Sequence, residues 1–389
     1  MNSKSDYQSI STEVSCLIKQ GRLHDALKQC DIAIFENKNE LECYKAKTRV
    51  LNQLGLQSEV IDAWEQGIQN NRNDFTFYHS KVCALRKQKR YDEIIKCYDQ
   101  GIMFNKNDPI FYAHKFVELE KQERLEEAIQ VWELGIQNNK TDPFFYKQKV
   151  QALLQCYGET ICQEKIAECW DLAIQNGNDN PFYIKSKVSA LEKLEQWDEV
   201  IKCLNYGIHM HRQALIYYED KANYLKKLNR LEEIIECWEE GIKNNPNNKL
   251  FYTKKIQALE DQEKIEQIIE EANHYISLFN DLIFYEAKTK CLFKQAKYEE
   301  IIQCWDYGIK NNDTTTTSSF YIKKIEALEI QGRWVDSIQC CDQGISKCFW
   351  NIEEIIKLKV HSLAQLNNFR KAQQYSRLIN ANQPQIFQN

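Results

Sequence analysis

A leucine recurs about every 34 residues from one end of this 389-residue chain to the other. The copies are separated by 34, 34, 34, 34, 38, 34, 34, 33, 36 and 35 residues and are Leu17, Leu51, Leu85, Leu119, Leu153, Leu191, Leu225, Leu259, Leu292, Leu328 and Leu363. A period of this length indicates a repeat array, in which each unit is too small to bury its own apolar face and must stack on its neighbours. The chain is therefore restricted to a stack of small, similar units.

Each unit has the pattern of two helices joined by a turn. In the copy at residues 77–109, two apolar stripes with a helical period flank a polar Lys/Gln/Arg stretch, and they consist of Tyr78, Val82 and Leu85, then Ile94, Ile95, Tyr98, Gly101 and Ile102. An Asn/Lys/Asp run followed by Pro109 predicts the end of the second helix and the start of the next unit. Strict apolar alternation is absent, so we predict an all-α fold without a sheet.

Three positions keep their residue type in most units. An aromatic anchor stands three residues ahead of a lysine, as Tyr44, Tyr78, Tyr112, Tyr146, Tyr218, Tyr252, Tyr285 and Tyr321, with Ile184 and Ile356 in its place twice. The second helix carries a large residue, as Trp64, Tyr98, Trp132, Trp170, Trp238 and Trp305, and three residues later a small one, as Ala33, Gly67, Gly101, Gly135, Ala173, Gly207, Gly241, Gly308 and Gly344. Because glycine inside a helix costs about 1 kcal/mol relative to alanine, its recurrence predicts that a helix of the neighbouring unit approaches closely there.

These residues resemble the tetratricopeptide repeat family. The match rests on the aromatic anchor, Leu seven residues on, Ile/Val/Ala about sixteen on, Tyr/Trp twenty on and Gly/Ala twenty-three on, with Pro246 ending one unit. The resemblance implies a right-handed superhelical solenoid of antiparallel helical hairpins, with first helices on the concave wall and second helices outside. We predict one array of about eleven units over residues 7–380, with 351–380 as a capping repeat, between a flexible N-terminus (1–6) and a disordered tail (381–389).

Composition and motifs exclude several classes of function. The net charge of −5 argues against a nucleic-acid binder, which would carry a basic stripe, and no run approaches the 18 apolar residues of a membrane helix. Residues 1–10 have no apolar leader core, so we expect a cytoplasmic protein. The sequence has no Cys-x-x-Cys pair, no His-Glu-x-x-His, no Gly-x-Ser-x-Gly and no phosphate-binding loop. We therefore predict no catalytic residue, no cofactor and no metal site.

The fifteen cysteines follow the repeat. Six of them stand one residue before the large position of the second helix, namely Cys97, Cys169, Cys203, Cys237, Cys304 and Cys340. Cysteine serves well as a small buried hydrophobe, so we predict that these six side chains are buried and unbridged.

A lysine occupies one slot of the repeat ten times, as Lys47, Lys81, Lys115, Lys149, Lys187, Lys221, Lys255, Lys288, Lys324 and Lys359. The favoured hypothesis is that its stem packs inside the hairpin while its ammonium meets an acid early in the second helix, namely Asp25, Glu59, Glu93, Glu127, Glu199, Glu233, Glu300 or Asp336. The alternative is a ladder of lysines that lines a groove for an acidic segment.

The resemblance also implies which side chains face a partner. They stand just after the anchors and four residues further on, and the candidates are Lys45, Arg49, His79, Lys147, Gln151, Lys185, Asn223 and Lys290, with Glu219, Gln257, Glu286 and Glu326 in the second half. We predict that an extended or helical peptide with an acidic portion binds in the N-terminal half, and a groove without this preference stays open as an alternative.

Some members of the family hold the C-terminal carboxylates of chaperones with a Lys/Asn, Asn, Lys/Arg set spread over three units. The corresponding positions here are Lys45 with Arg49, then Ser80, then Ile110 with His114, so this mode of docking is disfavoured.

The sequence thus predicts a non-catalytic scaffold or adaptor that binds protein partners, without membrane insertion. The alternative is a regulatory or α-type helical-repeat subunit of a multi-subunit enzyme, although the Trp-x-x-Arg and Asn-Pro-Lys-Asn signatures of prenyltransferase subunits are missing. Three irregularities stand out: four extra residues near 157–160, Ala272 and Tyr275 in place of the aromatic and the glycine, and a Thr/Ser run at 313–319. We expect this run to form a surface loop, with phosphorylation as the less favoured interpretation.

Overall fold

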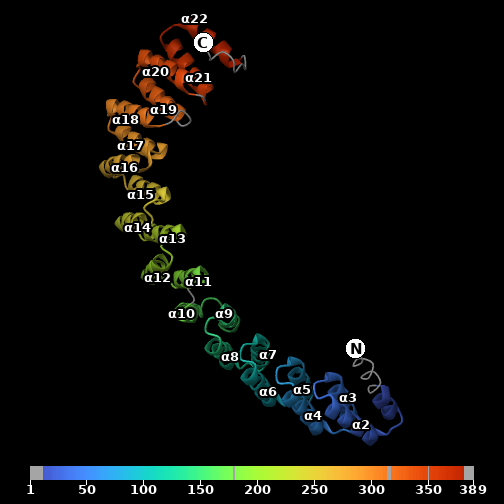
Figure 1. Ribbon diagram of the computed structural model, residues 1–389. Helices are drawn as coiled ribbons and strands as arrows, with labels where there is room; N and C mark the ends of the chain where they lie inside the picture. The colour runs from blue at the N-terminus through green and yellow to red at the C-terminus, as the bar shows by residue number, and fades with distance from the viewer. Residues whose placement is uncertain (1–11, 178–179, 313–316, 349, 381–389) are drawn as a thin grey trace. The chain divides into compact units, whose positions relative to one another are not determined.

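The structure, a computed structural model, describes residues 12–177, 180–312, 317–348 and 350–380, with side chains as far as residue 377 (Figure 1). Within these residues every regular element is a helix, so the all-α prediction is confirmed. The chain divides between Cys203 and Leu204 into two compact units, which are considered one at a time. The predicted flexible N-terminus (1–6) and disordered tail (381–389) lie outside the described residues, and the single array over 7–380 stays a prediction.

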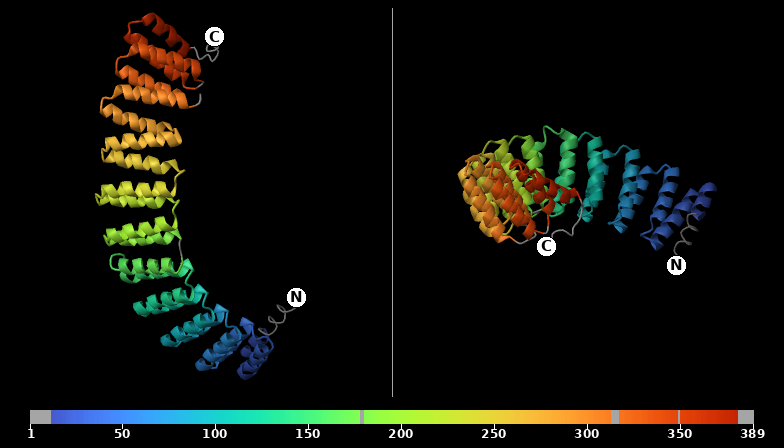
Figure 2. Two further views of the ribbon diagram at one scale, coloured as in Figure 1. Left: turned by 60° about the vertical axis from the view of Figure 1, so that its left-hand side comes forward. Right: turned by 90° about the horizontal axis from the view of Figure 1, so that it is seen from above.

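Unit 1 contains five first helices and the second helices that alternate with them, after a short helical stretch at residues 12–19. The first helices are α3 (Leu41–Gln53), α5 (Phe75–Lys87), α7 (Pro109–Lys121), α9 (Pro143–Tyr157) and α11 (Pro181–Lys193). The second helices are α2 (Leu23–Glu36), α4 (Gln57–Asn70), α6 (Tyr91–Phe104), α8 (Leu125–Asn138), α10 (Gln163–Gln175) and α12 (Trp197–Met210), and α12 runs across the division at 203. From α2 to α11 each helix packs against the next, and hairpins stack in sequence order (Figure 2).

Unit 2 repeats the same alternation. Its first helices are α13 (Leu215–Lys227), α15 (Lys249–Asp261), α17 (Leu282–Lys294), α19 (Thr317–Ile330) and α21 (Ile352–Gln365). Its second helices are α14 (Leu231–Asn244), α16 (Ile265–Phe279), α18 (Tyr298–Asn311), α20 (Trp334–Lys347) and α22 (Phe369–Asn380). Each helix again packs against its successor, from α13 to α22.

Six of the first helices begin with a capping side chain, whereas α3, α13 and α21 have none. An Asp or Asn accepts a hydrogen bond from the backbone N–H two residues on, at 2.8–3.1 Å, and these caps are Asp74, Asp108, Asp142, Asn180, Asn248 and Asp281. Proline follows the cap in α7, α9 and α11, where its missing N–H costs nothing. The Asn/Asp/Pro clusters of the sequence therefore mark helix starts as predicted.

In six second helices the glycine lies against an aromatic ring of the next first helix, whereas Gly344 of α20 meets Ile355. A Cβ built on Gly67 would lie 2.5 Å from Cδ1 of Phe77, and rings of Phe111, Phe145, Phe251 and Phe320 block the equivalent glycines in the same way. The prediction of a close neighbouring helix is confirmed, but a ring of that helix fills the space instead of its backbone. The missing side chain of glycine thus makes room for the aromatic residue that stands one position ahead of the anchor in the next hairpin.

Helix α16 exchanges the two sizes. Ala272 stands where other second helices carry tryptophan, and Tyr275 stands where they carry glycine, and both are almost fully buried. The Tyr275 ring packs edge-on against Tyr252, with centroids 4.8 Å apart, and against Phe284, with centroids 5.4 Å apart. The apolar volume is thus kept within one helix while its position shifts by one turn.

The turns between hairpins are tied to each other by side-chain amides. Asn71 Nδ2 donates to the Lys38 carbonyl of the preceding turn at 3.0 Å, and equivalent bonds join Asn105 to Arg72, Asn139 to Lys106 and Asn245 to Arg212 at 2.8 Å. The anchor hydroxyls donate to the same carbonyls, as from Tyr44 to Lys38 at 2.9 Å. These bonds fix the register between consecutive hairpins.

The structure corrects one loop prediction and supports another. Thr317 and Ser318 are buried in the first turn of α19, so the expected surface loop is wrong at 317–319, while 313–316 lie outside the described residues. A buried hydroxyl is closed to a kinase, which removes the phosphorylation interpretation for these two residues. The extra residues near 157–160 do lengthen a turn, since α9 ends at Tyr157 and α10 begins at Gln163.

Candidate partner-binding surface

The recurring lysines lie at junctions between hairpins. Nine of the ten form an ion pair with side-chain exposures of only 4–17% for the lysine, and the acids are Asp31 (to Lys47, 2.7 Å), Glu65 (to Lys81, 2.5 Å), Asp99 (to Lys115, 2.6 Å), Glu133 (to Lys149, 3.0 Å), Asp171 (to Lys187), Glu240 (to Lys221, 3.8 Å), Glu239 (to Lys255, 3.0 Å), Asp306 (to Lys324, 2.5 Å) and Asp342 (to Lys359). In all but the Lys221 pair, the acid belongs to the second helix of the preceding hairpin, one residue after its large position. The prediction of an acid early in the lysine's own second helix is therefore wrong.

Two junctions lack this acid, and their lysines behave differently. Asn205 and Asn273 stand at the acidic position, so Lys221 turns to its own hairpin. For Lys288, no ion pair occurs within the described part of the chain. An acid at this one position of the preceding second helix therefore decides whether the lysine pairs across the junction.

Five of the eight acids that were expected to meet the lysines instead meet an arginine three residues earlier. The pairs are Arg22 with Asp25, Arg90 with Glu93, Arg124 with Glu127, Arg230 with Glu233 and Arg333 with Asp336, at 2.5–2.8 Å. These carboxylates also lie in the first turn of their helices, where the helix dipole favours negative charge. These pairs are local to the helix starts, although Arg124 and Arg333 also reach Asp92 and Glu299 of the preceding hairpin.

The pKa values of Glu65 and Lys255 are both shifted in the direction that favours the charged form. Burial alone would raise the pKa of Glu65, but hydrogen bonds from Lys81 and Gln100 outweigh it and hold this pKa below its ordinary value. Burial likewise acts to lower the pKa of Lys255, yet its hydrogen bonds to Glu271 and Glu239 raise it. Because these ammonium groups are buried and already neutralised, they offer little to an acidic partner, which disfavours the lysine-ladder hypothesis.

All eight candidate groove residues are exposed on first helices. Four have a neighbouring side chain: Lys45 pairs with Glu42 at 2.7 Å, Lys290 pairs with Glu260 at 3.1 Å, His79 Nε2 lies 3.6 Å from Cys83 Sγ, and Lys147 Nζ lies 4.6 Å from the centroid of Phe182. Among the described residues, no hydrogen bond or ion pair engages the other four side chains, which are Arg49, Gln151, Lys185 and Asn223. Their role in binding stays a prediction.

The first-helix face of unit 2 is hollowed at three successive junctions. The hollows measure about 570, 330 and 300 Å³ and lie between α13 and α15, between α15 and α17, and between α17 and α19. Gln257 lines the first two hollows, and Glu286 and Lys290 line the last two, so the three adjoin. Apolar side chains of the first helices line all three, and second helices α14 and α18 add to the first and the last; the apolar residues include Ile216, Trp238, Ile283, Phe284, Phe293, Trp305 and Ile330.

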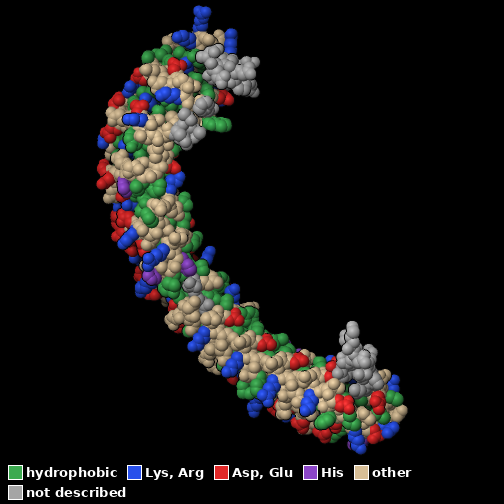
Figure 3. All heavy atoms as spheres, in the orientation of Figure 1, with side chains coloured by type: hydrophobic (Ala, Val, Ile, Leu, Met, Phe, Trp, Pro, Cys, Tyr) green, Lys and Arg blue, Asp and Glu red, His purple; other side chains and the backbone are tan. Residues whose placement is uncertain are grey.

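Ion pairs bridge the rims of these hollows. Lys254 pairs with Glu219 at 2.7 Å and Lys226 pairs with Asp261 at 2.6 Å, both between α13 and α15. Since these rim charges are already paired, the apolar side chains between them are the part of the surface that a partner could cover favourably. Figure 3 shows hydrophobic side chains surfacing between charged ones on the face in view.

Unit 1 separates its charges between the two kinds of helix. Helices α5 and α9 contain Lys or Arg but no Asp or Glu, whereas α4 and α8 each contain three Asp or Glu and no Lys or Arg. The net charge of −5 therefore hides a cationic first-helix face.

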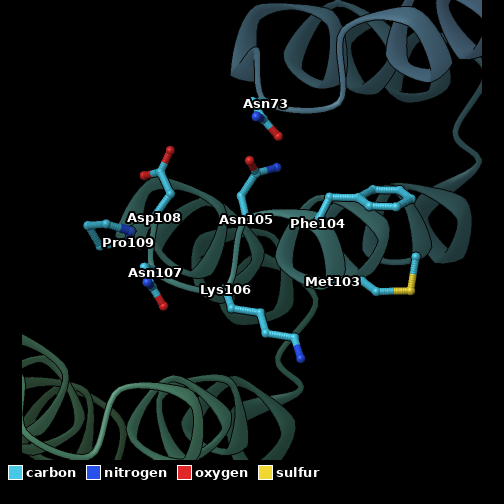
Figure 4. Close-up of a pocket in the computed structure, with 8 residues that line it drawn as sticks. All are labelled: Asn73, Met103, Phe104, Asn105, Lys106, Asn107, Asp108 and Pro109. Atoms are coloured by element: carbon cyan, nitrogen blue, oxygen red, sulfur yellow. The ribbon is translucent and has the colours of Figure 1, made fainter.

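A hollow of about 870 Å³ also lies at the turns before α5 and α7, and its side chains do not converge. Figure 4 shows Asp108 and Lys106 pointing away from each other. Asn105 is already engaged, because its Nδ2 donates to the carbonyls of Arg72 and Gly101. The remaining lining comes from Asn73, Met103, Phe104, Asn107 and Pro109.

The cysteine prediction is confirmed. The six cysteines beside the large position are buried and unbridged, and burial raises the pKa of Cys97 to about 12 and that of Cys203 to about 11. Such thiols stay protonated and unreactive at neutral pH. Among the described residues, no three His, Cys, Asp or Glu side chains meet as ligands of one metal ion would.

Sequence reasoning missed the exposed apolar residue two positions ahead of the anchor. It is Phe144, Phe182, Ile216, Leu250 or Ile283, each 38–50% exposed. The neighbouring residue, one position ahead of the anchor, is the buried ring that meets glycine. The signal in the sequence was a pair of adjacent apolar residues, of which the helical phase buries one and exposes the other.

Comparison with known proteins gives a limited result. No family model matches the chain, and no curated protein matches it. A solved structure of Naa15/Naa10 bound to HypK-THB is 13% identical with a TM-score of 0.30, covering 95% of this chain and 68% of that chain. The crystal structure of yeast Tom70 is 11% identical with a TM-score of 0.32, covering 95% and 97%. At these scores the similarity establishes neither a family nor a function for this chain.

The chain's own repeats define the fold. Each of its two units is built of antiparallel helical hairpins, with an aromatic anchor, a glycine or alanine contact and a leucine in most copies. Within the described residues, none of the helices combines the length and the apolar character that crossing a bilayer requires.

Proposed function

We propose that this protein is a non-catalytic scaffold that binds partner polypeptides on the exposed face of its first helices. The observation that carries the proposal is the row of three adjoining hollows on α13, α15, α17 and α19, with apolar side chains between paired rim charges. Hollows of a few hundred Å³ with apolar walls and a few polar groups suit side chains of a bound polypeptide. We further propose a cytoplasmic location.

We also propose that the N-terminal half takes an acidic portion of the partner. The cationic first helices of unit 1 support this assignment, with Arg49, Lys147 and Lys185 exposed along them. Charges of this kind set the specificity and the rate of association more than the final affinity.

Affinity capture of partners with paired variants tests the scaffold. Ile216→Asp/Ile283→Asp places charge on the first-helix face, where these residues are 49% and 40% exposed. The control, Leu278→Asp/Val335→Asp, alters second helices of the same unit at residues that are 52% and 67% exposed. We expect partners to be lost with the first variant and kept with the control.

Equal capture by both variants and the wild type would contradict the proposal, as would equal loss in both. A single catalytic chain captured in fixed stoichiometry would instead identify the protein as an enzyme subunit. Folding of every variant is checked by circular dichroism before capture.

A further inference from the structure

Two neighbouring first helices, α9 and α11, present the same pair of exposed side chains. Phe144 and Phe182 directly follow the prolines that begin these helices and are 38% and 44% exposed. Lys147 and Lys185 follow three residues later and are also exposed. One helical turn separates each phenylalanine from its lysine, so the two side chains share a face.

The rings are fixed by the core beneath them. Phe144 packs edge-on against Trp132 with centroids 6.2 Å apart, and Phe182 packs edge-on against Trp170 with centroids 5.6 Å apart. Both tryptophans are almost fully buried. Aromatic surface that is held in place before binding loses little conformational entropy when a partner covers it.

The two pairs form one continuous surface. The Nζ of Lys147 on α9 lies 4.6 Å from the centroid of the Phe182 ring on α11. Gln151 and Leu154 of α9 are exposed on the same helix, and α9 contains no Asp or Glu. We call Phe144, Lys147, Phe182 and Lys185 the Phe/Lys surface.

The ammonium groups of the Phe/Lys surface differ from those of the recurring lysines. Within the described residues, no carboxylate forms an ion pair with Lys147 or Lys185. The next lysines of the same helices, Lys149 and Lys187, are bound by Glu133 and Asp171. Two kinds of lysine thus alternate along each helix, one paired inside the stack and one free to meet an outside anion.

Other copies lack the combination. In unit 2 the equivalent pairs are Ile216 with Glu219, Leu250 with Thr253, and Ile283 with Glu286, and Glu219 is already paired with Lys254. Copies α5 and α7 carry Thr76 with His79 and Ile110 with Ala113. Among the described first helices, an exposed ring followed three residues later by an exposed lysine therefore occurs in α9 and α11 alone.

We infer that the Phe/Lys surface receives an acidic segment of a partner polypeptide that also carries a bulky apolar side chain. The inference rests on the proposed scaffold function and adds the place and the chemistry of binding. Carboxylates of the segment meet Lys147 and Lys185, and its apolar side chain covers Phe144 and Phe182. Since the surface is open to water, binding weakens with added salt.

Exposed rings with lysines also suit single-stranded nucleic acid, on which bases stack. The neighbouring second helices disfavour this occupant, because α8 carries Glu126, Glu127 and Glu133 and no cation. A continuous phosphate backbone needs a longer cationic path than two lysines.

A random 12-residue peptide library displayed on phage, selected on the full-length chain, tests the inference. The most enriched peptide is then labelled with fluorescein and titrated by anisotropy. We expect enriched peptides to combine Asp or Glu with Leu, Phe or Trp. The dissociation constant should rise at least tenfold for Lys147→Glu/Lys185→Glu, for Phe144→Ala/Phe182→Ala and for a peptide with Asn and Gln in place of its acids.

The control variant is Lys96→Glu/Lys165→Glu, which makes the same change in net charge on exposed lysines of the second helices α6 and α10. It should change the dissociation constant less than twofold. The lysine variant alters only exposed side chains, so it keeps the test valid if removal of the two rings disturbs folding.

Enriched peptides that are neutral or basic, or that keep their affinity in both surface variants, overturn the inference. If such peptides lose affinity in Ile216→Asp/Ile283→Asp, the scaffold function stands and only the Phe/Lys assignment fails. If no peptide is enriched, both fail. A labelled twelve-nucleotide oligo(U) that competes with the peptide and loses binding in the lysine variant would also overturn the inference.

Discussion

The contact between glycine and ring allows a prediction in which two known effects have opposite signs. Replacing glycine by alanine inside a helix stabilises it by about 1 kcal/mol when space is free. At Gly67, a Cβ would lie 2.5 Å from Cδ1 and 3.0 Å from Cε1 of Phe77, and 3.3 Å from Cδ1 of Tyr44. Carbon atoms in contact are usually about 3.5–4.0 Å apart, so the ring must retreat by about 1 Å.

The Phe77 ring has little room to retreat. It is fully buried and packs edge-on against Tyr44, with centroids 5.2 Å apart, and against Trp64, with centroids 6.4 Å apart. Overpacking of this kind costs about 1–3 kcal/mol. With the upper part of that range and the gain in helix propensity, we expect Gly67→Ala to destabilise the chain by about 1–2 kcal/mol.

At the junction of α10 and α11 the small residue of the second helix already carries a methyl group. Ala173 replaces the glycine there, and Tyr183 faces it with its ring turned to 28° from the plane of Trp170, against 68° for Phe77 and Trp64. Among the described residues, the buried Tyr183 hydroxyl has no hydrogen-bond partner. The stacked ring is thus one way in which the next helix accommodates a methyl group.

A double-mutant cycle separates the two effects. In a Phe77→Ala background the obstruction is gone, so Gly67→Ala should stabilise by up to about 1 kcal/mol. Repeat arrays can unfold in parts, so urea midpoints should be supported by hydrogen exchange of α4 and α5. Stabilisation by Gly67→Ala in both backgrounds would refute the reasoning.

Three further predictions follow from other contacts. Lys255→Met leaves Glu239 and Glu271 without their cation and should lower the free energy of unfolding in urea by about 2 kcal/mol. This loss is smaller than for a fully buried pair because Glu239 is half exposed. The control Lys288→Met should change the free energy little, and equal losses in both variants would contradict the junction pairing. Glu123→Gly removes a side chain from a residue at φ 60° and should raise thermal stability by about 1 kcal/mol, and a loss of stability would be against expectation. Burial, and to a lesser extent the charge of His79, lowers the pKa of His114 below 6.5. The unfolded chain therefore binds a proton more readily than the folded chain, and stability declines as pH falls below about 6.5. His114→Gln should reduce this decline in urea melts at pH 7.5 and 5, and equal declines in the variant and the wild type would contradict the direction of the pKa shift.

The repeat made the helices and their buried residues predictable. The anchor tyrosines, the cysteines and the glycines each follow from a position that recurs every 34 residues, and burial of these positions is a property of the repeat as a whole. Helix starts were equally readable, because capping residues act over two residues of chain. Local and periodic signals therefore determined the fold.

The same periodicity concealed the ion pairs. Glu93 and Glu65 both recur with the repeat, and either could serve Lys81 as judged from the sequence alone. Only the packing of α4 on α5 brings Glu65 to 2.5 Å from Lys81. The Phe/Lys surface was half visible: Lys147 and Lys185 were predicted, but Phe144 was hidden beside buried Phe145, since one residue of helix phase separates exposed from buried.

The exchange of Ala272 and Tyr275 also limits what tryptophan fluorescence can report about local opening of this protein. Trp64, Trp132, Trp170, Trp238 and Trp305 sit buried at their junctions, so their emission senses opening there. Among the described ring contacts, those of α16 with α15 and α17 involve only tyrosine and phenylalanine. Opening confined to α16 would thus leave the tryptophan spectrum nearly silent, and a tryptophan installed at Ala272 could not report it faithfully, because Tyr275 already fills that space.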